Sequence, residues 1–155
     1  MALTQGDKAP DFTLKNTQGE QVSLQDYQGS QNVVLLFFPL AFSSVCTDEL
    51  CHMRDNLKDY EKLDAEVAGI SVDSFYALRE FKKQQNLNFT LLSDFNKEAC
   101  NSYGAKHEDL FGYKGVAKRS AFVVDKQRKI AYAEVLDDPG SLPDFEKIQS
   151  TLKSL

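Results

Sequence analysis

Residues 32–55 read NVVLLFFPLAFSSVCTDELCHMRD, and this stretch decides the fold of the chain. Its first part, residues 32–38, is after Asn32 a continuous run of aliphatic and aromatic side chains, the pattern of a central strand buried on both faces. Pro39 interrupts that run, and a helical pattern begins at about Ser43. A buried strand followed directly by a helix predicts α/β architecture.

The flanking sequence extends this prediction in both directions. Alternating polarity predicts two hairpins, one from residues 11–14 and 21–24 and one from residues 120–125 and 129–136. Further strands are expected at 66–72 and 89–92, and helices at 43–63, 74–85, 96–103 and after Pro143. Since no repeat or linker is visible, we expect residues 1–155 to form one domain with a mixed central β-sheet flanked by helices and an N-terminal β-hairpin.

Composition and charge exclude several classes of function. The 155 residues carry 18 Lys plus Arg against 23 Asp plus Glu, a formal net charge of −5, so no positive field for nucleic acid is expected. The longest apolar run, residues 33–42, falls well short of the roughly 20 residues that span a bilayer. The first residues, MALTQGDKAPDF, lack an apolar secretory core, so the sequence predicts a cytoplasmic protein.

Cys46 has both a structural and a chemical interpretation. It lies within an apolar helical stripe, which would suit a small packed hydrophobe. It also falls in the first turn of the predicted helix, where unpaired backbone N–H groups and the helix dipole favour a thiolate. Ser43 and Ser44 are expected to cap this helix, and Pro39 to shape a loop that shields the sulfur. Spacing alone does not decide between the two interpretations. The stripe consists of Leu50, Met53, Leu57 and Tyr60.

Cys51 lies about 140° around the helix from that stripe, so its thiol is expected to face away from the core. Residues five apart in a helix have Cα atoms about 8.5 Å apart. A disulfide needs less than about 7 Å, so joining Cys46 to Cys51 would require the first turns to unwind. A zinc site formed with His52 is the weaker reading, because Cys-x4-Cys-His matches no common zinc spacing. His52 and His107 are predicted to be surface residues.

Several motifs in order resemble the peroxiredoxin family. PLAFSSVC, residues 39–46, matches the family signature of Pro, three residues, Thr or Ser, two residues and Cys. Further segments that resemble the family occur in order along nearly the whole chain. FFPLAF and LLSDF look like the alkyl hydroperoxide reductase E branch, whereas CTDELCHMRD looks like the bacterioferritin comigratory protein (peroxiredoxin Q) branch. The other segments are GDKAPDFTL, GISVDS and KRSAFVVD.

The resemblance implies a thioredoxin-like fold and a thiol peroxidase without a bound cofactor or metal. It implies that Cys46 is the peroxidatic cysteine, that Ser43 hydrogen-bonds the peroxide and that Pro39 shields the site. Arg119 would complete the site and Glu49 would orient Arg119. Read without the family, Arg119 and Glu49 would be solvated charges.

The same resemblance implies that Cys51 is the resolving cysteine and that a thioredoxin- or glutaredoxin-like reductant recycles the disulfide. The mixed signature leaves open a one-cysteine enzyme resolved by an external thiol. A thiol-based redox sensor is a further alternative, and a disulfide reductase is the weakest because no Cys-x-x-Cys is present. Cys100 is expected in the core. Peroxide is the implied substrate, and the family also includes homodimers formed through apolar loops near the site.

Overall fold

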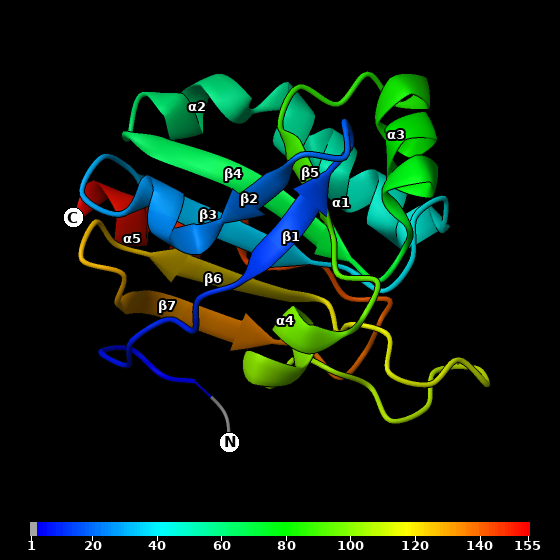
Figure 1. The fold of residues 1–155 in the computed structure, drawn as a ribbon. Coiled ribbons are helices and arrows are strands. Elements are labelled where there is room, and N and C mark those ends of the chain that lie inside the picture. Colours follow the sequence, from blue (N-terminus) through cyan, green and yellow to red (C-terminus); the bar gives the residue numbers. More distant parts are fainter. Residues whose placement is uncertain (1–2) are drawn as a thin grey trace.

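A computed structural model describes residues 3–155 of the chain (Figure 1). Within that range, seven strands form one sheet in the order β2-β1-β5-β4-β3-β6-β7. The strands are β1 Thr13–Asn16, β2 Gln21–Ser23, β3 Asn32–Phe37, β4 Ala65–Ser71, β5 Thr90–Ser93, β6 Ser120–Val124 and β7 Ile130–Val135. The helices are α1 Ser44–Asp55, α2 Leu57–Glu61, α3 Phe75–Gln84, α4 Glu98–Ser102 and α5 Phe145–Lys153, with a short 3-10 helix η1 at Leu24–Tyr27. The α/β class and both hairpins are confirmed.

The centre of the sheet is parallel and its flanks are antiparallel. β3 pairs in parallel with β4, and β4 with β5. β6 runs antiparallel to β3 on one side, and β1 runs antiparallel to β5 on the other. The carboxyl ends of the three parallel strands therefore meet at one edge, which is where ligands collect in sheets of this kind.

β3 is buried on both faces, as its unbroken hydrophobic sequence predicts. Val33, Leu35 and Phe37 pack into the cluster on one face of the sheet, and Val34 and Leu36 into the cluster on the other. Helices α1, α2, α3 and α5 cover the second face, while α4 and the N-terminal segment cover the first (Figure 1). Within residues 3–155, no helix combines the length and the apolar character needed to cross a membrane.

Away from Cys46 and Cys51, the structure departs from the sequence prediction at three places. The predicted helix 43–63 is broken at Asn56, whose side-chain amide donates to the His52 carbonyl and ends α1. Helix α4 begins at Glu98 rather than residue 96, because the Asp94 carboxylate accepts from its first amides and the intervening Lys97 is left-handed, with φ 63°. His107, predicted to lie at the surface, is buried, and this burial lowers the pKa of its imidazole.

Candidate active site

Cys46 lies at the carboxyl edge of the sheet, two residues into α1. β3 ends at Phe37, a six-residue loop follows, and α1 begins at Ser44. The Thr47 amide donates to the Ser43 carbonyl at 2.9 Å, which is the first hydrogen bond of the helix. The amides of residues 44–46 therefore have no partner within the helix, and their partial positive charge favours an anion at this position.

Arg119 meets Cys46 from the neighbouring strand. It directly precedes β6, which pairs with β3, and its Nη2 lies 3.1 Å from Cys46 Sγ. The Pro139 carbonyl accepts from Arg119 Nε at 3.3 Å and from Nη2 at 3.0 Å, which fixes the plane of the guanidinium. Only 1% of Arg119 is exposed, so the structure excludes the solvated residue that its sequence context alone suggests.

Glu49 lies behind the guanidinium, one helical turn after Cys46. Arg119 Nη1 donates to Glu49 Oε1 at 2.5 Å, and both side chains are buried. Glu49 Oε2 has no hydrogen-bond partner among the described residues. Burial raises the pKa of the Glu49 carboxyl to about 7, since it outweighs the attraction of Arg119, and the Glu134 charge adds to the rise. The Arg119 guanidinium thus lies between the Cys46 thiol and the Glu49 carboxyl, and all three side chains are almost fully buried.

The titration of Glu49 predicts a pH-dependent stability. A carboxyl whose pKa is raised on folding binds its proton more tightly in the folded state. We therefore expect the free energy of unfolding to fall, relative to Glu49→Gln, as pH rises from about 4.5 to about 7. Urea unfolding across this range measures the difference. Glu108→Gln, which neutralises an exposed carboxylate, is the control, and a wild type that parallels Glu49→Gln at every pH would contradict the prediction.

Ser43 and Pro39 lie at the same opening. Ser43 is the N-cap residue of α1 by its backbone, but neither it nor Ser44 caps the helix as predicted: Ser43 Oγ donates to the Leu40 carbonyl at 2.8 Å. Its oxygen lone pairs therefore remain able to accept a hydrogen bond. Pro39 is buried beside it. Both line a cavity of about 290 Å³ that reaches Arg119.

Cys46 itself is fully buried, with 0% of the residue exposed. The cavity touches its neighbours on both sides, Val45 of the helix and Arg119 of the sheet, but stops short of the sulfur. The Pro139 carbonyl that binds Arg119 belongs to a wall of the same cavity. Because no part of Cys46 is exposed, a peroxide reaches the sulfur only when neighbouring groups move.

The other two cysteines differ in their surroundings. Cys51 is half-buried, and its Sγ lies 3.5 Å from Gln85 Oε1 at the end of α3, so it faces a second helix rather than open solvent as predicted. Cys100 is buried in the core, where burial and the nearby Asp94 raise the pKa of its thiol to about 12. All three cysteines are free thiols. The intact helix α1 keeps Cys46 and Cys51 apart.

The residues on the far wall of the cavity were not predicted from the sequence. Leu110 and Phe111 line it from the loop before β6, and Pro139 and Gly140 line it from the segment after β7. Asp-Pro-Gly at 138–140 signals a turn in the sequence, but nothing local indicates which site that turn would cover.

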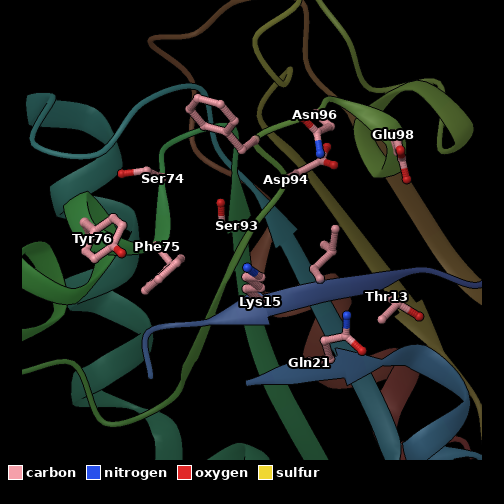
Figure 2. Close-up of a pocket in the computed structure, with 12 residues that line it drawn as sticks. Thr13, Lys15, Gln21, Ser74, Phe75, Tyr76, Ser93, Asp94, Asn96 and Glu98 are labelled. Atoms are coloured by element: carbon pink, nitrogen blue, oxygen red, sulfur yellow. The ribbon is translucent and has the colours of Figure 1, made fainter. Parts of the chain in front are cut away.

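A larger cavity of about 500 Å³ lies elsewhere along the same edge of the sheet. Figure 2 shows Lys15 on β1, Phe75 and Tyr76 at the start of α3, and Asp94 just after β5 around it. None of the three cysteines lines this cavity, and the Asp94 carboxylate is already bound by the first amides of α4. Arg119, which contacts the Cys46 sulfur, lines the smaller cavity and not this one.

Comparison with known proteins identifies relatives along most of the chain. Residues 5–133 match the AhpC/TSA family. Peroxiredoxin Bcp of Escherichia coli strain K12 is 40% identical over 139 residues, covering 88% of this chain and 86% of that protein. Alkyl hydroperoxide reductase E of Mycobacterium tuberculosis is 38% identical over 144 residues, covering 92% and 91%. The crystal structure of peroxidoxin BcpB from Mycobacterium tuberculosis superposes with a TM-score of 0.87 at 29% identity, covering 99% of this chain and 98% of that one.

Proposed function

Because the chain belongs to the AhpC/TSA family of peroxiredoxins and is a thiol peroxidase with a thioredoxin-like fold, we propose that Cys46 is its peroxidatic cysteine, with Arg119, Ser43 and Pro39 completing the site. The observation that carries this assignment is the contact between Arg119 Nη2 and Cys46 Sγ at 3.1 Å. The guanidinium places a cationic hydrogen-bond donor directly beside the sulfur that would attack the peroxide.

In the first step the Cys46 thiolate attacks one peroxide oxygen. A sulfur–oxygen bond forms, the O–O bond breaks, and the departing oxygen takes up a proton to give an alcohol or water. The sulfur is oxidised to sulfenic acid. Negative charge moves from the sulfur to the departing oxygen, so donors fixed around the sulfur bind the transition state better than the ground state. Arg119 is such a donor, because Glu49 and Pro139 hold its guanidinium in place.

The cavity supplies the approach for peroxide. Ser43 Oγ, whose proton is engaged by the Leu40 carbonyl, accepts a hydrogen bond from the peroxide hydroxyl. The other walls are mostly apolar, with Leu40, Val45 and Phe111 among them. Apolar walls of this kind favour organic hydroperoxides as well as hydrogen peroxide.

In the second step the Cys51 sulfur attacks the Cys46 sulfenic acid: the S–S bond forms, the S–O bond breaks, and the hydroxyl leaves as water with the proton of the Cys51 thiol. A thioredoxin- or glutaredoxin-like reductant in the cytoplasm then reduces the disulfide. The first turns of α1 must unwind for this step. Two features support such local unwinding. The helix start lacks a side-chain cap, which ordinarily stabilises a helix by about 1 kcal/mol, and Phe42 just before it is held at φ 71°, an unfavourable conformation for a residue with a side chain.

The disulfide is tested by mass spectrometry of reduced protein treated with one equivalent of peroxide. We expect the wild type to lose two hydrogen atoms and the linked peptides to contain Cys46 and Cys51. Cys51→Ser should instead gain one oxygen atom and react with a sulfenic-acid probe. Cys100→Ser is the matched control and should still form the bond, because Cys100 is buried in the core. Wild-type protein that keeps its sulfenic acid would indicate a one-cysteine enzyme.

A further inference from the structure

Phe111 is the most exposed large hydrophobic side chain among residues 3–155. It is 85% exposed, whereas the next in order, Tyr76, is 67% exposed. An apolar side chain stabilises a fold only to the extent that folding removes its surface from water. The ring of Phe111 therefore contributes little to the stability of the chain, and packing within the chain does not account for it.

The backbone at Phe111 is also unfavourable for a phenylalanine. The Leu110 amide donates to the Tyr113 carbonyl at 2.8 Å, and the Tyr113 amide donates to the Leu110 carbonyl at 2.9 Å, so residues 110–113 form a tight hairpin turn. Both central residues have positive φ, 54° at Phe111 and 88° at Gly112. Turns of this kind favour Asn, Asp or Gly at the first central position, because a larger side chain is crowded there. Phe111 thus occupies a position that suits a small polar residue better.

The turn that carries Phe111 is anchored beside the proposed active site. It lies in the segment between α4 and β6, which projects from the body of the molecule and leads directly to Arg119 (Figure 1). The Asp109 carboxylate accepts from the Gly112 amide at 2.9 Å, and the Leu110 side chain is buried. These contacts hold the turn from both sides, so the ring of Phe111 is presented at a defined place.

That place is a wall of the cavity of about 290 Å³ that reaches Arg119. Ser43 and Arg119 supply hydrogen-bonding groups to the lining, whereas Leu40, Val45 and Phe111 supply apolar surface. A water molecule occupies about 30 Å³ in the liquid, so hydrogen peroxide fills only a small part of this cavity. The remaining volume has room for carbon atoms attached to the peroxide group, and apolar walls are their favourable surroundings.

We propose that Phe111 is a specificity-determining residue, whose ring packs on the hydrocarbon part of an organic hydroperoxide while the O–O group lies at Ser43 and Arg119. This inference rests on the proposed reaction at Cys46. In that reaction the thiolate attacks the terminal oxygen, a sulfur–oxygen bond forms and the O–O bond breaks. The sulfur becomes sulfenic acid, and the alkoxide that leaves takes up a proton to give an alcohol. Phe111 takes part in none of these bond changes and acts by holding the hydrocarbon.

Contact with a hydrocarbon accounts for both unfavourable features of Phe111. The surface of the ring that is exposed in the free protein leaves water when the substrate binds, and so does the surface of the hydrocarbon. An aromatic side chain has only two torsions to fix, so little conformational freedom is lost in this contact. Hydrogen peroxide has no apolar part and gains nothing from the ring. We therefore expect the dependence of the rate on Phe111 to increase with the size of the hydrocarbon.

The test compares Phe111→Asn with the wild type in stopped-flow oxidation of the reduced protein by hydrogen peroxide, tert-butyl hydroperoxide and cumene hydroperoxide. The ratio of the cumene hydroperoxide rate constant to the hydrogen peroxide rate constant should fall about tenfold, the scale on which apolar pockets discriminate. The ratio for tert-butyl hydroperoxide should fall less. Because Asn suits the positive φ of this turn, the variant should unfold thermally at or above the temperature of the wild type. A loss of specificity in so stable a protein is not caused by misfolding.

Two further variants serve as controls. Phe111→Leu keeps an apolar side chain at the same position and should retain most of the wild-type ratio. Tyr113→Asn removes an exposed aromatic ring from the same turn, but this ring does not line the cavity, so the ratio should equal that of the wild type. If Phe111→Asn had the same ratio as Tyr113→Asn, the role of Phe111 would be overturned. Cys46→Ser identifies a failure of the proposed function instead, because consumption of peroxides by that variant would place the reaction at another group.

Discussion

Cys46→Ser should reduce peroxide consumption at least about a thousandfold, because a hydroxyl is not ionised near neutral pH and is a far weaker nucleophile than a thiolate. The substitution changes one atom in a buried position between the sheet and α1, so the fold should be kept. Stopped-flow measurement of peroxide loss with reduced protein, without any external reductant, isolates the first chemical step. Thermal unfolding of the same sample verifies that the protein is folded.

Cys100→Ser is the matched control for this experiment. Cys100 is also buried, but its thiol contacts the carbonyls of Lys97 and Gly115 rather than a cation, and the pKa of about 12 keeps it protonated. We expect this variant to consume peroxide at close to the wild-type rate. If Cys46→Ser retained that rate as well, the peroxidase chemistry would have to reside at another group, and the proposed site would be wrong.

The sequence predicts the parts of this molecule that depend on neighbours along the chain. β3 is recognisable because burial on both faces leaves no polar alternation, and Cys46 is recognisable because the strand, the Pro39 loop and the helix follow one another directly. Hydrophobic periodicity also predicts the buried side of α1, including Leu50 and Met53. These are local patterns, and the structure retains them.

Contacts between distant segments are not predictable in this way. Arg119 is 73 residues from Cys46, and only the antiparallel pairing of β6 with β3 brings its guanidinium to the sulfur. Composition and spacing alone suggest a solvated charge for Arg119, and the family resemblance was needed to place it at the site. The contact of Cys51 with Gln85 was missed for the same reason, since it depends on how α3 packs beside α1. The break at Asn56 depends on one side-chain hydrogen bond, which competes with continued helix.

Arg119→Met should slow the first step about 100- to 1,000-fold. It removes the hydrogen-bond donor that stabilises the negative charge as this charge shifts from the sulfur to the departing oxygen. It should also destabilise the fold, since it leaves Glu49 buried without its partner. A buried carboxylate that loses its cation costs roughly 3–5 kcal/mol if it stays charged. Most of that cost is avoided when the Glu49 carboxyl is protonated, and protonation is favoured because its pKa is already raised. The destabilisation should therefore be small at low pH and grow as pH rises through neutrality.

The double variant Arg119→Met/Glu49→Leu separates the two consequences. Removing the carboxyl abolishes the unpaired charge, so the free energy of unfolding at high pH should recover toward that of the wild type. The rate of peroxide reduction should not recover, because nothing replaces the guanidinium beside Cys46. Urea unfolding and single-turnover kinetics on the wild type, Arg119→Met, Glu49→Leu and the double variant complete the cycle. If activity returned together with stability, Arg119 would act only by balancing Glu49, and its role in stabilising the transition state would have to be abandoned.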